Sequence, residues 1–164
     1  MNGTESIKAA LESTRFVANW FLSDLSDADL FVRPAPTANH IAWQMGNVIV
    51  GDRHLVMEQL PDAKYPELPA GFMEMHGKEG AGKDGPAGFL TKDEYVALFD
   101  AVRSATIAAV GHLSDADLDR PTTGQMAAFA PRLGDLLLLV SNHTLMHAGQ
   151  FSVIRRVLGK PVLF

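Results

Sequence analysis

Apolar residues recur at three- and four-residue spacing in separate stretches of the chain, a pattern typical of α-helices. The first stretch follows a candidate N-cap at Thr4. Its stripe consists of Ile7, Leu11, Thr14, Val17, Ala18, Phe21 and Leu25. The second runs from about His40 to Leu60 and is apolar on nearly every side between Ile41 and Val50. No stretch alternates apolar and polar residues for long enough to suggest a strand, so the pattern predicts an all-α fold.

Two further helices are predicted in the second half of the chain. The third begins at a capping box, Thr91 to Glu94, and its apolar stripe continues to Leu113. The fourth runs from about Gly134 to Leu158 and stops at Gly159, with a proline shortly after. Together the four segments predict one domain over residues 1–164, folded as a four-helix bundle.

The sequence Leu-Ser-Asp-Ala-Asp-Leu occurs twice, at residues 25–30 and 113–118, and an Arg-Pro pair follows each copy. Each copy follows one predicted helix and precedes the next. Turns capped by Ser and Asp are typical of links between neighbouring antiparallel helices. The repeat therefore predicts two helical hairpins, the first helix with the second and the third with the fourth.

A long connection, residues 61–90, joins the two halves and contains four prolines and six glycines. Most connections in compact domains are far shorter. This one is long enough to run back along the bundle, which favours a crossover with the second and third helices parallel. The segment either covers part of a site or is a passive connection; the sequence leaves both interpretations open.

Composition excludes several classes of function. The formal net charge is −5 and basic residues do not cluster, which argues against a nucleic-acid groove. The absence of cysteine excludes disulfides, thiolate metal sites and a cysteine nucleophile. The N-terminus shows no signal peptide, and the apolar runs fall far short of the roughly 20 residues of a membrane helix. We expect a cytoplasmic protein that contacts neither membrane nor nucleic acid.

The candidate chemistry lies in the histidines of the fourth helix. His143 and His147 are one turn apart on the core side, so their imidazoles could converge on one ion. Alternatively, each could be a buried neutral histidine with its own hydrogen-bond partner. No glutamate follows His143, so this is not the zinc-protease motif. We assign no chemistry to the other four, expecting a cap or surface position at His40, exposure at His54, a loop position at His76 and a helix end at His112.

Two segments resemble the DinB/YfiT-like superfamily. Residues 41–47, Ile-Ala-Trp-Gln-Met-Gly-Asn, resemble the signature of its second helix. Residues 143–150, His-Thr-Leu-Met-His-Ala-Gly-Gln, followed by Arg-Arg-Val-Leu-Gly-Lys-Pro, resemble that of its fourth. The repeated turns and the Pro/Gly-rich loop also match. The resemblance implies a four-helix bundle in up-down-down-up order, often dimeric, and many members hold zinc or nickel with three histidines.

Carried onto this chain, the resemblance places the metal ligands at His143, His147 and Asn47. Asn47 stands where the family has histidine, and an amide oxygen is a weaker and harder ligand than imidazole. We expect Asn47 to lie across from the two imidazoles, with Gln150 nearby, because a lone amide in this apolar stretch needs partners.

Two functions remain open at this stage. One is a metal-dependent enzyme acting on a small molecule, of hydrolase or thiol-dependent transferase type; the resemblance implies that characterised family members include thiol-dependent transferases and isomerases. The other is a non-catalytic dimeric helical protein whose vestigial metal site binds a small ligand or none. With either function we expect a homodimer, with the first hairpin's apolar surface as the interface. The sequence identifies no substrate and no catalytic residue.

Overall fold

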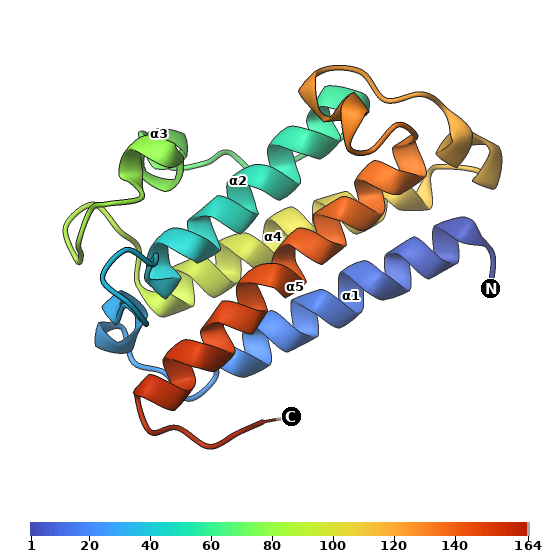
Figure 1. Cartoon of the computed structure of the whole chain (residues 1–164). Helices are drawn as coiled ribbons and strands as arrows, with labels where there is room; N and C mark the ends of the chain where they lie inside the picture. Colours follow the sequence, from blue (N-terminus) through green and yellow to red (C-terminus); the bar gives the residue numbers. More distant parts are fainter. Residues whose placement is uncertain (164) are drawn as a thin grey trace.

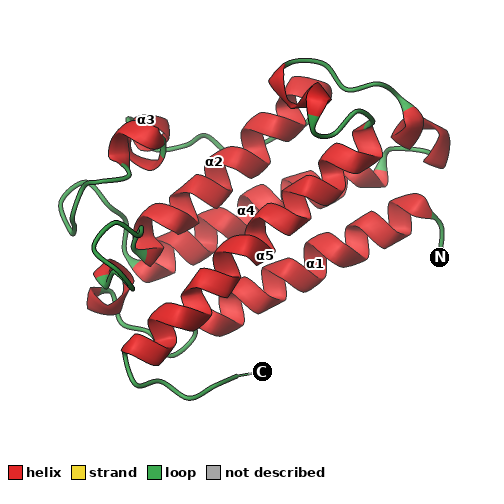
Figure 2. Ribbon diagram, in the orientation of Figure 1, coloured by secondary structure: helices red, strands yellow, loops and turns green. Residues whose placement is uncertain are grey.

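The computed structural model describes residues 1–163 and confirms the all-helical fold (Figures 1 and 2). The four long helices are α1 (Gly3–Leu22), α2 (Ile41–Gln59), α4 (Lys92–Gly111) and α5 (Leu133–Val157). A short helix, α3 (Phe72–His76), lies in the long connection. Short 3-10 turns span Ala28–Phe31, Lys78–Gly80, Asp115–Asp119 and Gln125–Ala128. Over residues 1–163 there is no sheet, and none of the helices is long and apolar enough to cross a membrane.

The helices form a four-membered bundle in up-down-down-up order (Figure 1). Helix α1 packs against α5 and α4, and α2 packs against the same two helices. Near the ends of α5 and α1, Arg155 donates to the Phe21 carbonyl over 2.9 Å, so these two helices are parallel. The predicted crossover is confirmed, because α2 and α4 run side by side in the same direction.

The prediction of two hairpins is wrong. Helices α1 and α2 lie diagonally across the bundle, and so do α4 and α5. The repeated turns show the cause. Each turn caps the N-terminus of a helix that is not adjacent to the turn in the sequence. Asp27 accepts from the backbone N–H of Lys92 at the start of α4, over 2.7 Å. The equivalent Asp115 accepts from the N–H groups of Gly3 and Thr4 at the start of α1, over 3.2 and 3.0 Å. A carboxylate suits both positions because helix N-termini carry partial positive charge.

The ends of the helices follow the sequence signals with one exception. The Thr91–Glu94 capping box is confirmed at the start of α4. Thr4 is not the N-cap of α1; that position is taken by Asn2, which forms a reciprocal capping box with Glu5. A box that begins two residues earlier satisfies two of the N–H groups that a helix start leaves unpaired.

The core fixes which faces of α2 and α5 meet. Leu22, Met45, Phe99 and Phe151, one from each long helix, are at most 1% exposed. Each such side chain contributes about 1.5–3 kcal/mol by leaving water. The apolar contacts therefore hold the four helices in one register, and the polar residues between them occupy fixed positions.

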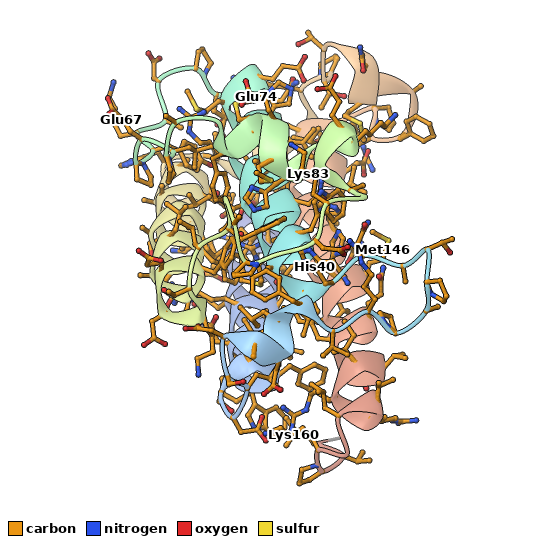
Figure 3. The ribbon with its side chains drawn as sticks, turned by 90° about the vertical axis from the view of Figure 1, so that its left-hand side faces the viewer. His40, Glu67, Glu74, Lys83, Met146 and Lys160 are labelled. Carbon is orange, nitrogen blue, oxygen red and sulfur yellow. The ribbon has the colours of Figure 1, made fainter. Side chains whose placement is uncertain are left out.

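The crossover segment lies across the outer side of α2 (Figure 3). The indole N–H of Trp43 donates to the Gly77 carbonyl over 3.1 Å. His40 Nε2 lies 3.0 Å from the Lys83 carbonyl oxygen. These contacts tie the segment to the first half of α2, the part that also faces α5.

Candidate metal site

His143 and His147 bring their Nε2 atoms within 3.1 Å of each other, so the two rings converge on one point. The rings are nearly perpendicular, at 77°, with centroids 4.7 Å apart. His147 is 5% exposed and His143 is half-buried. One helical turn separates the two residues, and the apolar face of α5 directs both rings toward α2.

The opposing surface of α2 carries Gln44 and Gly51. The fully buried Gln44 places its Oε1 2.9 Å from His147 Nδ1. A Cβ atom on Gly51 would lie 3.1 Å from His143 Cε1, so the absence of a side chain lets that ring approach the helix. Because α2 and α5 are antiparallel, the earlier residue of α2 meets the later histidine of α5.

Asn47 lies between these two positions, three residues after Gln44 and four before Gly51, on nearly the same side of the helix. It is half-buried, and its Nδ2 donates to the His76 backbone carbonyl over 2.9 Å. The sequence predicts Gln150 as a neighbour of Asn47. In the structure, the partner of the Asn47 amide N–H is the crossover segment instead. That Asn47 shares an ion with the two imidazoles stays a prediction.

Burial keeps the imidazole pair in the form that binds metals. Desolvation, together with the smaller effect of the charge on a protonated His143, lowers the pKa of His147 to about 4. The pKa of His143 is also lowered, chiefly by burial, although the Asp52 carboxylate opposes that shift. Both rings are therefore neutral at pH 7, and a neutral imidazole has a lone pair to donate.

The other histidines occupy different surroundings. The sequence predicts a cap or a surface position for His40. The structure shows it as the N-cap of α2, and it is fully buried. His76 is a buried residue that the sequence indicated only as part of a loop: its Nδ1 lies 2.8 Å from the Phe72 carbonyl oxygen and its Nε2 lies 2.6 Å from the Tyr95 hydroxyl. His54 is exposed, and His112 caps the end of α4.

The convergent pair has no third histidine or carboxylate beside it. Within residues 1–163 no three His, Cys, Asp or Glu side chains are grouped so that they could hold an ion. Asp52, one residue after Gly51, is instead paired with Arg103 over 2.7 Å. Among these residues, any further protein ligand is therefore an amide, a hydroxyl or a backbone oxygen.

Comparison with known proteins places the chain in one family. The sequence model of the DinB superfamily matches residues 10–151. No curated protein matches the chain significantly in sequence. Among solved structures, a crystal structure of a conserved protein from Enterococcus faecalis superposes with a TM-score of 0.74. It is 17% identical and the match covers 98% of this chain and 99% of that one, so it shows the same fold. The chain belongs to the DinB superfamily.

Proposed function

We propose that this protein is a metal-dependent enzyme acting on a small molecule, of hydrolase or thiol-dependent transferase type. His143 and His147 would hold a divalent ion, zinc or nickel, through Nε2, and Asn47 would complete the set through Oδ1. The observation that carries the proposal is the approach of the two imidazole Nε2 atoms to 3.1 Å in a buried setting.

The residues present fit such an ion. Zn–N bonds are about 2.0–2.1 Å long, so two nitrogens separated by 3.1 Å can both reach one metal. The Asn47 amide is held by its N–H donation to the His76 carbonyl, which leaves the oxygen as its ligating atom. An amide oxygen binds zinc or nickel less strongly than imidazole, so we expect weaker affinity than a three-histidine site would have.

An ion in this position would polarise a substrate or lower the pKa of a bound water or thiol. The chain's own residues set the conditions for that chemistry. Gln44 orients His147 from the buried side, and the helices exclude water from behind both rings. Fewer than four strong protein ligands would leave coordination positions open for a substrate, as in catalytic zinc sites generally.

One feature favours the alternative, a non-catalytic homodimer. Helix α5 carries a line of exposed apolar side chains, which are Leu138, Leu145, Met146, Val153 and Val157. Such lines mark association surfaces in many proteins. In this alternative Asn47 would serve only to bind the crossover segment to α2, and the imidazole pair would be vestigial.

Metal analysis of protein purified without an affinity tag tests the proposal. We expect bound zinc or nickel, and calorimetric titration of the metal-free protein should give one site per chain. His143→Ala and His147→Ala should each abolish that binding. His54→Ala, which removes an exposed histidine of α2, is the matched control and should bind normally.

A folded wild-type protein that takes up neither metal in the titration would overturn the proposal. Metal binding without turnover of ester, amide or thiol-plus-electrophile substrates would support the alternative instead. In that case light scattering should show a dimer that a polar substitution at Val153 dissociates.

A further inference from the structure

We infer that Gln44 is a positioning residue that fixes His147 in its Nδ1–H tautomer, so that only His143 must change tautomer when an ion binds. The consequence for ion binding rests on the proposed metal site. The tautomers themselves follow from the hydrogen bonds of the metal-free chain.

The backbone of Asn39 fixes the orientation of the Gln44 amide. Its Nε2 lies 2.7 Å from the Asn39 backbone carbonyl oxygen, which can only accept a hydrogen bond. The NH₂ group must therefore face Asn39, and the amide oxygen faces α5. Because Gln44 is fully buried, no water competes for either end of the amide.

The Gln44 amide oxygen then determines which nitrogen of His147 carries the proton. Gln44 Oε1 is an acceptor, and it lies 2.9 Å from His147 Nδ1. The contact is a hydrogen bond only when Nδ1 carries the proton. In a neutral ring the other nitrogen is then bare, so the Nε2 lone pair of His147 points toward His143 and is ready to bind an ion.

His147 in turn determines the tautomer of His143. Its Nε2 lies 3.1 Å from the bare Nε2 of His147. Two lone pairs at that distance would repel, so in the metal-free protein His143 Nε2 carries a proton and donates it to His147. His143 is thus in the opposite tautomer, with Nδ1 bare beside the backbone at Gly51.

The two histidines consequently play different parts in loading the metal. His147 needs no rearrangement. On His143 the Nε2 proton must leave to solvent and a proton from solvent must bind Nδ1, so that the ring remains neutral and its Nε2 lone pair becomes available. His143 is partly exposed, which gives both protons access to water. Loading therefore breaks the hydrogen bond between the two rings and keeps the one to Gln44.

Long-range ¹H–¹⁵N correlation spectra of the uniformly ¹⁵N-labelled, metal-free protein at pH 7.5 test the assignment directly. We expect the Nδ1–H pattern for His147 and the Nε2–H pattern for His143. After addition of zinc, both rings should show the Nδ1–H pattern with a metal-shifted Nε2. The spectra identify each histidine through His143→Gln and His147→Gln variants.

Gln44→Leu should release His147 into a tautomer mixture and weaken zinc binding about 10- to 100-fold, the usual effect of losing a hydrogen-bond partner of a ligating histidine. Gln44→Glu retains an acceptor toward Nδ1 and, when protonated on its other oxygen, a donor toward the Asn39 carbonyl, so it should keep both the His147 pattern and the affinity. Gln59→Leu is the matched control, since Gln59 is on the same helix and bonds to the backbone of Thr123, away from the site.

The outcomes separate this inference from the proposed function. A wild-type His147 in the Nε2–H form, or one whose tautomer Gln44→Leu leaves unchanged, would overturn the role of Gln44. The expected tautomers in a protein that binds no zinc or nickel would support Gln44 as the positioning residue and overturn the metal-dependent enzyme.

Discussion

Two polar clusters lie side by side inside this bundle, and they differ in how their polar atoms are satisfied. The first is centred on the Asp52–Arg103 ion pair, which is fully buried. The second is the His143–His147 pair. Asp52 directly follows Gly51, which contacts His143, so the two clusters are neighbours along α2.

In the ion-pair cluster, the polar groups form hydrogen bonds with one another and with the protein backbone. The Arg103 guanidinium donates to Asp52, and the Asp52 carboxylate also accepts from Thr106 over 2.6 Å. The remaining partners of Arg103 come from α1 and α5 and are the Leu11 carbonyl, the Thr14 hydroxyl and the Thr144 hydroxyl. All four long helices thus meet at one guanidinium. A buried charge satisfied in this way has a structural role and leaves nothing to bind a ligand.

The imidazole pair instead places two identical nitrogens against each other. Only one can carry a proton in the observed contact, so the pair could exchange its hydrogen bond for two bonds to an ion. Burial alone therefore does not distinguish structure from site. The distinction is whether the polar atoms oppose complementary partners or converge on one another.

The largest effect on stability should come from breaking the ion pair. Asp52→Ala leaves the buried Arg103 charge without its carboxylate, and we expect a loss of about 3–5 kcal/mol in the free energy of unfolding. Urea unfolding followed by circular dichroism measures it. Asp62→Ala, at an exposed position, should change stability by less than about 0.5 kcal/mol. A loss below about 1 kcal/mol for Asp52→Ala would contradict a structural role for this cluster.

The second largest effect should be a loss of stability in acid, caused by the buried imidazole of His147. His147 has a pKa of about 4 in the folded chain and an ordinary value near 6.5 when unfolded. Between these values only the unfolded chain binds the proton, so the stability is complete above about pH 6.5 and falls as the pH drops toward 4. For His147 alone the loss is about 3 kcal/mol, since one pKa unit corresponds to about 1.4 kcal/mol.

Unfolding titrations from pH 7.5 to 4.5 measure this loss, and His147→Gln, which cannot be protonated, should flatten the curve. The carboxylates that cap helices act in a separate window. The pKa of Asp115 is lowered by the N–H groups of Thr4 and Gly3, so its contribution is lost only below the ordinary value of 3.8. A wild-type stability that stays constant across the upper window would contradict the burial of neutral His147.

The sequence predicted the elements better than their arrangement. Periodicity and caps located the four long helices within a few residues, because those signals are local. The pairing of helices is not local. The repeated turns belong to connections over residues 23–40 and 112–132, which are long enough to cross the bundle. Their aspartates then cap helices far away in sequence, which no turn signature reveals.

Local signals also predicted part of the candidate site, but its non-local contacts were not predictable. The spacing of His143 and His147 on one helix face indicated that their rings could converge, and they do. Gln44 had a signal, since it precedes Asn47 by one turn, but no rule distinguishes it from any other buried glutamine. The partner of Asn47 is a backbone carbonyl in a glycine-rich loop, and only the folded path of that loop brings it to α2.

Converting Asn47 to histidine should increase metal affinity more than any other single change. Asn47→His supplies a third imidazole where the resemblance places the family's ligand, and we expect zinc or nickel to bind at least about 100-fold more tightly. His143→Ala should abolish binding in both backgrounds. Competition titration with a chelating dye measures the affinities. A folded Asn47→His protein with unchanged affinity would show that this position does not reach the ion.

The smallest effect is expected from substitutions at two glycines inside helices, Gly51 in α2 and Gly149 in α5. Alanine in a helix interior is favoured over glycine by about 0.5–1 kcal/mol. At Gly149 a Cβ would meet nothing within 4 Å, so Gly149→Ala should give the full gain and leave metal affinity unchanged. At Gly51 the Cβ would lie 3.1 Å from the His143 ring, which must move by a few tenths of an ångström. Gly51→Ala should therefore gain less stability, and it should weaken zinc binding by less than the change at Gln44 does. Thermal unfolding and zinc titration of the two variants side by side give both quantities. Equal effects of the two substitutions on zinc affinity would mean that the close approach of His143 to α2 does not matter for the ion.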